Sequence, residues 1–261
     1  MKKTLLLCMA LVVALGMMAQ TPQQLASVRL KKVLGDMIKN HTAIPYSSLE
    51  DVYPYTDLRA DGTIWDIYSS LGKLRLSNTG SYKGEGDAYN KEHTVPQSWF
   101  NEASPMKSDA FQVIPVDGYV NNRRSNYPYG EVASPTYVSA NSFSKLGPCV
   151  TPGYSGTVFE PNDEYKGDVA RIYFYMVTCY YDKVGGWTGG VFGQKDKFAD
   201  YKGYPGMAEW QLKMLIRWAK QDPVSQKEID RNNAVYQKQG NRNPFVDCPG
   251  LERFIWSEYA E

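Results

Sequence analysis

The stretch Glu92-His93-Thr94-Val95-Pro96 carries one of only two histidines in the chain, the other being His41. A glutamate directly before a histidine raises the question whether His93 is a catalytic group. In an extended segment adjacent side chains point to opposite faces, so the two reach one site only where a strand ends or bends. The alternative is a salt-bridged surface glutamate beside a hydrogen-bonded histidine, and the pair taken alone favours that alternative.

A second polar segment, residues 109–128, reads DAFQVIPVDGYVNNRRSNYP. Asp117 is predicted to cap a short helix that runs from about Gly118 to Arg124. Asn121 then stands one turn into the helix, three residues before Arg124 and on the same side. Read in isolation, the segment NNRRSN is equally typical of a solvated loop.

These residue types suit the hydrolysis of a phosphodiester. Carboxylate and amide oxygens are hard ligands that suit Mg²⁺. A histidine with a pKa of about 6.5 can accept a proton from water at neutral pH. Guanidinium groups bind phosphate oxygens in a bidentate manner.

Taken together, the segments resemble the endonuclease I family of secreted and periplasmic bacterial nucleases, and look most like its members from Bacteroides-type bacteria. The likeness extends over about residues 89–247. The stretches that carry it are Glu92–Pro96 with Ser98-Trp99, Gly118–Asn121 with Arg124–Asn126, Phe159–Pro161, Arg171–Met176 and Gln239–Phe245.

The resemblance implies an α+β fold, a single mixed domain with a ββα-metal (His-Me finger-like) nuclease core and several helices. It implies that His93 is the general base and that Glu92 and Asn121 hold Mg²⁺, with Mn²⁺ or Ca²⁺ as alternatives. It further implies a metal-dependent endonuclease that cleaves DNA, with RNA as a second substrate. Little sequence preference and 5′-phosphate ends are expected.

Two arginines are candidates for the contact with the substrate phosphate, Arg124 and Arg171. For Arg171 the alternative is a buried ion pair with Glu160 or Asp168.

One departure from the family concerns Gln112, where members commonly carry a histidine. Glutamine keeps its hydrogen-bonding capacity but cannot titrate. A role in holding neighbouring groups survives this change, whereas a role in proton transfer does not. A second hypothesis is therefore a catalytically weakened nucleic-acid-binding protein. A third is a different metal hydrolase, acting on sugar phosphates or lipids.

The N-terminus is typical of a secretory signal peptide. It has a basic start, an apolar run and a small residue at its end. We expect residues 1–19 to be the signal peptide, with cleavage after Gly16 as the alternative to Ala19, and residues 20–261 to be the nuclease domain. An exported protein, periplasmic or extracellular, follows. No later apolar run is long enough to cross a membrane. The exported protein is expected to be a monomer.

The net charge of the exported chain limits how it binds a polyanion, and its cysteine content limits the disulfides and metal sites it can form. Without Lys2 and Lys3, 27 basic and 28 acidic residues remain, so a polyanion has to bind through a local basic patch. The remaining cysteines allow one disulfide and one free thiol, and their spacing fits no zinc-binding pattern. They are Cys149, Cys179 and Cys248.

Periodicity predicts the remaining elements. Apolar spacing indicates helices over residues 22–40, 166–181 and 207–221. Ser225, with Glu228 three residues later, predicts a capping box at the start of another helix. Asp61-Gly62 indicates the turn of a hairpin over residues 52–68. Residues 73–91 and 130–165 are expected to be irregular, and His41 to be a surface residue at a helix C-terminus.

Overall fold

The computed structural model describes residues 23–192 and 203–260. The predicted signal peptide, residues 1–19, lies outside the described residues. Within the described ranges, no helix is both long and apolar enough to cross a membrane.

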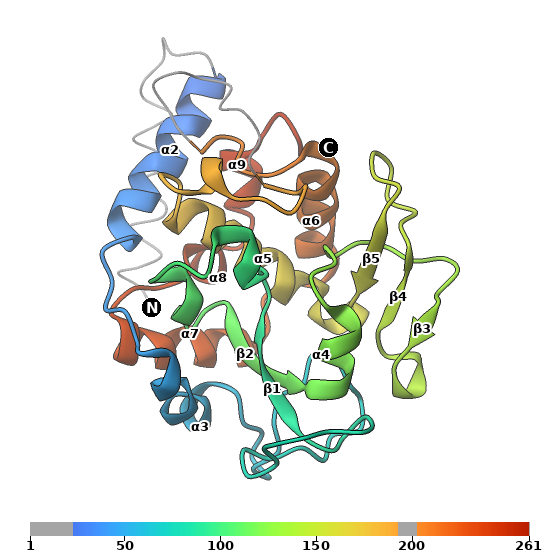
Figure 1. Ribbon diagram of the computed structural model, residues 1–261. Coiled ribbons are helices and arrows are strands. Elements are labelled where there is room, and N and C mark those ends of the chain that lie inside the picture. Colours follow the sequence, from blue (N-terminus) through green and yellow to red (C-terminus); the bar gives the residue numbers. More distant parts are fainter. Residues whose placement is uncertain (1–22, 193–202, 261) are drawn as a thin grey trace.

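The core is built around helix α5 (Lys166–Cys179), of which 13 of 14 residues are buried. A helix that is covered on nearly all sides has to lie inside the domain. Helices α2 (Gln23–Ile38), α6 (Glu209–Gln221) and α8 (Pro244–Asp247) pack against it. The predicted helices over 22–40, 166–181 and 207–221 are therefore confirmed, each within two residues of its expected start (Figure 1).

Helix α7 (Gln226–Gln239) begins with the predicted capping box. The Ser225 hydroxyl accepts from the Glu228 backbone N–H, and the Ser225 backbone N–H donates to the Glu228 carboxylate at 2.9 Å. Helix α3 (Tyr53–Thr56) packs against α7 and α9 (Glu252–Ile255) against α2. Short 3-10 turns connect these elements: η1 (Tyr46–Asp51), η2 (Gln97–Phe100), η3 (Met106–Ser108), η4 (Ala140–Ser142), η5 (Asp163–Tyr165) and η6 (Val184–Gly186).

Two antiparallel strands and one helix form a unit that we call the hairpin–helix unit. Strand β1 (Tyr89–His93) pairs with β2 (Val113–Asp117), so that Glu92 lies opposite Ile114. Helix α4 (Gly118–Arg124) follows β2 directly and packs against β1. The Asp117 carboxylate accepts from the Val120 backbone N–H at 3.0 Å, which confirms the predicted cap.

A second sheet corrects the expectation that residues 130–165 are irregular. Strands β3 (Tyr137–Val138), β4 (Lys145–Pro148) and β5 (Thr157–Glu160) pair antiparallel in that order, beside the helices in Figure 1. Each strand is at most four residues long, and β4 contains a glycine and a proline. Strands this short show no alternation in the sequence, so their pairing depends on the partners across the sheet.

The hairpin predicted over residues 52–68 is wrong in its extent, but its turn at Asp61-Gly62 is confirmed, with Gly62 N donating to the Arg59 carbonyl at 2.9 Å. Part of that range forms α3, and only one isolated antiparallel bridge joins Leu58 to Ile64. The Asp66 carboxylate accepts from the Tyr68 and Ser69 backbone N–H groups at 2.8 and 3.2 Å. These local bonds bend the chain where a strand was expected.

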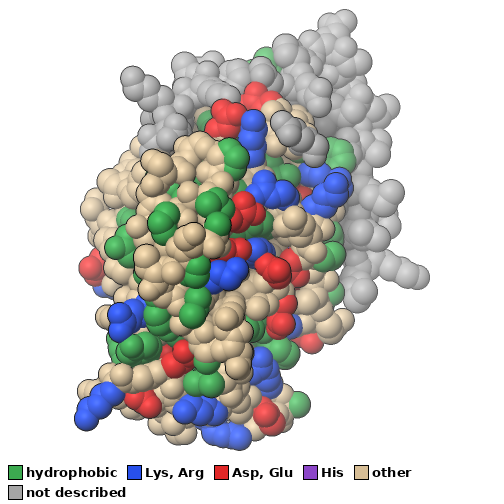
Figure 2. Space-filling model, turned by 90° about the vertical axis from the view of Figure 1, so that its right-hand side faces the viewer, with side chains coloured by type: hydrophobic (Ala, Val, Ile, Leu, Met, Phe, Trp, Pro, Cys, Tyr) green, Lys and Arg blue, Asp and Glu red, His purple; other side chains and the backbone are tan. Residues whose placement is uncertain are grey.

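The face of the molecule shown in Figure 2 carries acidic and basic side chains interspersed with one another. This mixture agrees with the near balance of charge in the sequence. Electrostatic binding of a polyanion therefore depends on a few local cations rather than on a broad basic face.

The buried position of Met176 on α5 gives a test of the packing. Met176 is 0% exposed, whereas Met37 on α2 is 53% exposed. Met176→Ala should lower the free energy of unfolding by about 2–5 kcal/mol, because it leaves a cavity in the core. Met37→Ala, the matched control, should change it by less than about 0.5 kcal/mol. Denaturant unfolding measures both, and equal effects would contradict the placement of α5.

Candidate active site

Glu92 projects from β1 toward α4 and is buried. Its Oε1 accepts from the Tyr68 hydroxyl at 2.6 Å and from Arg124 Nη1 at 2.7 Å. Burial raises the pKa of the Glu92 carboxyl, and Arg124 and Tyr68 oppose that rise. Within the described chain Oε2 accepts no hydrogen bond, so one oxygen of a firmly oriented carboxylate stays available to a cation.

Arg124, at the C-terminal end of α4, ties this helix to β1. Besides Glu92, its Nη1 donates to the His93 carbonyl at 2.9 Å, and its Nη2 donates to the Thr94 carbonyl at 2.7 Å. Its guanidinium also lies 4.8 Å from the centre of the Tyr129 ring. Because Arg124 is buried and bound to these groups, the geometry does not support the expected contact with a substrate phosphate.

Asn121 lies midway along α4, the helix that packs against β1. The helix begins where Gly118 N donates to the Ala88 carbonyl at 2.9 Å, next to the start of β1, and it ends at Arg124, next to the end of β1. Asn121 precedes Arg124 by three residues and so shares its face of the helix. The side chain is half-buried and forms no hydrogen bond to any other described residue. Its amide oxygen is thus free to act as a second ligand.

His93 is the last residue of β1 and directly follows Glu92. Its Nε2 lies 2.9 Å from the Lys107 carbonyl oxygen, and its ring stacks on that of Tyr46, 5.7 Å away at 14°. A carbonyl only accepts, so Nε2 carries the hydrogen and Nδ1 of the neutral ring keeps its lone pair. Burial lowers the pKa of His93 to about 4, although the bond to Lys107 opposes this.

Gln112 holds the segment that orients His93. Its Nε2 donates to the Met106 carbonyl at 2.7 Å, and its Oε1 accepts from the Val95 backbone N–H at 3.2 Å. Met106 and Lys107 belong to the same turn, η3. An amide supplies both the donor and the acceptor that these contacts need, and no proton transfer is involved.

His41 was expected on the surface, and this expectation is wrong. Its side chain is 1% exposed, with Nε2 at 2.9 Å from the Tyr180 hydroxyl and 3.7 Å from Asp109 Oδ2. Asp109 Oδ2 also accepts from the Tyr175 and Tyr180 hydroxyls at 2.7 and 2.6 Å. The turn after α2 brings His41 against Tyr180 and Asp109. The sequence pattern of a helix C-terminus does not reveal contacts with such distant residues.

Potential ligand atoms of His41, Asp109 and Cys179 lie within 4.8 Å of one another. Asp109 Oδ1 accepts from the Phe111 N–H and from Gln239 Nε2, so both carboxylate oxygens are already hydrogen-bonded. The contacts therefore describe a buried hydrogen-bond network that fixes the chain just after η3. Sequence reasoning missed this network, because its members are far apart along the chain.

Cys149 and Cys179 are free thiols. The expectation of one disulfide among Cys149, Cys179 and Cys248 is therefore wrong, because two of the three cysteines are free.

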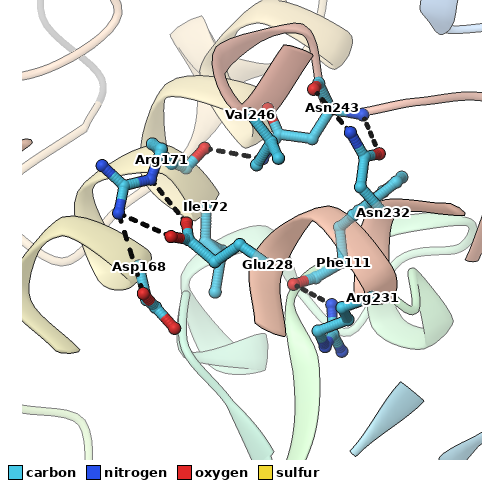
Figure 3. A pocket seen from close by; sticks show the side chains of 9 residues that line it. All are labelled: Phe111, Asp168, Arg171, Ile172, Glu228, Arg231, Asn232, Asn243 and Val246. Atoms are coloured by element: carbon cyan, nitrogen blue, oxygen red, sulfur yellow. Dashed lines mark hydrogen bonds and ion pairs between the residues drawn. The ribbon is translucent and has the colours of Figure 1, made fainter. Parts of the chain in front are cut away.

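Arg171 on α5 is buried in the pocket shown in Figure 3. Its Nε and Nη2 donate to the two oxygens of Glu228 at 2.5 and 2.8 Å, and Nη2 lies 3.7 Å from Asp168. The predicted alternative, a buried ion pair, is thus confirmed for Asp168, with Glu228 as the main partner. Glu160 instead binds Lys166 at 2.7 Å. Direct contact of Arg171 with substrate has no support in this geometry.

Residues 26–250 match the endonuclease I family. The chain belongs to the endonuclease I family. Membership makes it a nucleic-acid hydrolase, as the motifs around Glu92, His93 and Asn121 predicted. It also removes the support for a hydrolase that acts on sugar phosphates or lipids.

Several curated proteins of this kind are similar to the chain. An extracellular ribonuclease of Bacillus amyloliquefaciens is 32% identical over 234 residues, which are 87% of this chain and 73% of that protein. Endonuclease-1 of Buchnera aphidicola is 28% identical over 54% of this chain and 46% of its own length. An extracellular deoxyribonuclease of Aeromonas hydrophila is 26% identical over 56% of this chain and 52% of its own length.

The environment of His93 predicts an unusual titration. In the metal-free protein the imidazole of His93 should titrate near pH 4, whereas the ordinary pKa of histidine is 6.5. Because the unfolded chain binds this proton at the higher pH, the fold should lose stability as the pH falls from about 6.5 to about 4. Proton NMR measures the titration, with the signals assigned through His93→Gln. A midpoint at or above 6.5 would contradict the buried, neutral ring.

The bridging role of Gln112 predicts a loss of stability on truncation. Gln112→Ala leaves the buried Met106 carbonyl and Val95 N–H without partners, which should cost about 1–3 kcal/mol. Gln226 is exposed on the first turn of α7, so Gln226→Ala serves as the control and should change stability by less than about 0.5 kcal/mol. Thermal and denaturant unfolding compare the two, and a neutral Gln112→Ala would show that the bridge is dispensable.

Proposed function

We propose that the chain is a metal-dependent endonuclease, with His93 as general base and Glu92 and Asn121 as the ligands of a divalent cation. The observation that carries this proposal is the arrangement at the end of β1. There, a carboxylate oriented by Arg124 and a histidine oriented by the Lys107 carbonyl are adjacent in the chain. The hairpin–helix unit would then be the ββα-metal core of the fold.

The donor set fits a hard cation. Glu92 Oε2 and the Asn121 amide oxygen are the oxygens left without hydrogen bonds by the described residues around them. Two protein ligands leave positions for waters and phosphate oxygens, as Mg²⁺ requires, with Mn²⁺ or Ca²⁺ as alternatives. When bound, such an ion stabilises the negative charge that builds on the phosphate and the leaving oxygen.

His93 supplies the proton acceptor. The hydrogen bond from Nε2 to the Lys107 carbonyl leaves the Nδ1 lone pair for the attacking water. As Nδ1 takes the proton, the water oxygen bonds to phosphorus and the P–O3′ bond breaks. The 3′-oxygen leaves with the bonding electron pair and takes a proton from solvent water. The products are a 5′-phosphate and a 3′-hydroxyl. The low pKa keeps the imidazole neutral, and so able to act as a base, throughout the neutral pH range.

We further propose DNA and RNA as substrates, with little sequence preference. Contacts to the sugar–phosphate backbone carry no sequence information. Similar proteins carry the names ribonuclease and deoxyribonuclease, and these two names together support activity on both nucleic acids. Export of a monomeric enzyme after removal of residues 1–19 is part of this proposal, and the extracellular and periplasmic names of similar proteins support the export.

The weakened binding protein remains the competing proposal. It rests on the absence of a histidine at Gln112. The contacts of Gln112 are both backbone hydrogen bonds, which argues for a supporting role that glutamine fulfils. Under the competing proposal Gln112→His should raise cleavage many-fold, whereas under the enzyme proposal it should leave the rate nearly unchanged or lower it through misfit.

Plasmid cleavage tests the enzyme. The wild type should nick DNA and cut RNA in Mg²⁺ and stop in EDTA. His93→Ala should fold and bind DNA but cleave about 10²–10⁴ times more slowly, because only proton transfer is removed. Asn121→Ala should need more Mg²⁺ than the wild type, and Glu92→Ala should behave likewise, provided that unfolding measurements show it to be folded.

Asn122→Ala is the matched control for Asn121→Ala, since Asn122 is the next residue of α4 and is exposed. It should keep the wild-type dependence on Mg²⁺. Cleavage by His93→Ala at more than about a tenth of the wild-type rate would exclude His93 as the general base. A gel shift without cleavage by the wild type in any metal would favour the binding protein.

A further inference from the structure

Two lysines and a tyrosine lie near His93. Lys91 and His93 are two residues apart on β1, so their side chains lie on the same face of the strand. Tyr46, from η1, stacks on His93, and its ring is approached by Lys91 Nζ at 4.8 Å and by Lys107 Nζ at 5.7 Å. Two ammonium groups thus meet at one aromatic ring beside the catalytic base.

The carboxylates that pair with these lysines are exposed. Lys91 Nζ lies 2.7 Å from Glu50, and Lys107 Nζ lies 2.6 Å from Glu102. The side chains of Glu50 and Glu102 are 54% and 55% exposed. The lysine side chains themselves are 15% and 30% exposed, so each pair is only partly open to solvent. Because the carboxylates lie on the outside of these pairs, each can turn into solvent when another anion takes its place.

The two arginines that the sequence suggested as phosphate contacts differ from these lysines. Arg124 and Arg171 are both buried and each is bound to a buried carboxylate. Exchanging such a partner for a phosphate would leave a carboxylate unpaired in the interior, which is costly. Close to His93, the cations that can exchange their partners are therefore Lys91 and Lys107.

We propose that Tyr46, Lys91 and Lys107 form a phosphate-binding subsite for the nucleic-acid strand next to the bond that is cut. This inference rests on the proposed function of His93. The ammonium groups replace their bonds to Glu50 and Glu102 with bonds to backbone phosphates of the substrate. Tyr46 is a positioning residue, whose ring supports both the imidazole plane and the two ammonium groups.

Lys107 has two separable parts in this subsite. Its backbone carbonyl orients His93, and its side chain is free to bind phosphate. Substitution of the side chain leaves the carbonyl in place. Lys107→Ala should therefore raise KM while kcat stays within about twofold of the wild type, as expected when a contact present in both ground and transition states is removed.

Binding of a single-stranded DNA oligonucleotide at several salt concentrations tests the subsite directly. The protein is kept in EDTA, and a gel confirms that the oligonucleotide stays intact. Each lysine that contacts a phosphate contributes about 0.7 to the slope of log K against log salt. The double variant Lys91→Ala/Lys107→Ala should therefore lose about 1.4 of that slope, and bind about tenfold or more weakly at low salt.

A matched control exists elsewhere on the surface. Lys238 Nζ lies 4.4 Å from the ring of Tyr55. These two residues form an exposed lysine–tyrosine pair that does not contact His93. Lys238→Ala should leave both the salt slope and the affinity unchanged. A loss equal to that of the double variant would show a general effect of charge and would overturn the subsite.

The carboxylate partners give a test of opposite sign. Glu50→Gln and Glu102→Gln free the lysines, so each should tighten binding by about 1.5–5-fold. A merely structural role of the ion pairs predicts no such gain. Tyr46→Phe should keep kcat and Tyr46→Ala should lower it, because the ring and not the hydroxyl makes the contacts.

An unchanged salt slope in the double lysine variant, or weaker binding by the glutamine variants, would overturn the subsite. The proposed function is judged separately, by cleavage with His93→Ala. An inactive His93→Ala together with unaffected lysine variants would reject the subsite alone. An active His93→Ala would reject the general base, whatever the lysines do.

Discussion

The buried ion pair between Arg124 and Glu92 is the interaction on which the site depends. Removing two charges from water is expensive, and the cost is met only where geometry and further hydrogen bonds compensate. Here one guanidinium binds a carboxylate and two backbone carbonyls of the chain that includes β1. The pair therefore holds α4 against β1 and sets the position of Asn121 relative to Glu92. Replacing either partner leaves the other charge buried alone.

Cations in this chain divide into two groups by burial. Arg124 and Arg171 lie inside the domain, where planar guanidinium groups bind several acceptors at once. Lys91 and Lys107 are partly exposed near His93, and their carboxylate partners are exposed to water. A cation that holds elements of the fold together has to be buried, whereas a cation that binds a substrate phosphate has to be accessible. A chain with almost no net charge can therefore still bind a polyanion locally.

The orientation of His93 depends on contacts from many parts of the chain. Lys107 supplies the carbonyl, and Gln112 bonds to the same turn. Just beyond that turn, Asp109 is fixed by hydroxyls from the end of α5 and by Gln239 from the end of α7. The core around α5 thus supports the imidazole through hydrogen bonds. This explains how a non-titrating residue at Gln112 is compatible with the role proposed for His93.

The sequence by itself determined the features that arise within a few residues. Apolar periodicity predicted α2, α5 and α6. Ser225 and Asp117 predicted the N-caps of α7 and α4, because helices and caps form between residues three or four apart. The ordered motifs from Glu92 to Phe245 likewise identified the family.

Only the tertiary structure decided the features that depend on distant partners. It buried His41 against Asp109, made three strands of residues 130–165, and turned Arg124 and Arg171 from phosphate contacts into internal ion pairs. An arginine near a motif has the same sequence signature whether it faces solvent or a buried carboxylate. The choice depends on which side chains the fold brings within hydrogen-bonding distance, and for Arg171 that partner, Glu228, lies 57 residues away.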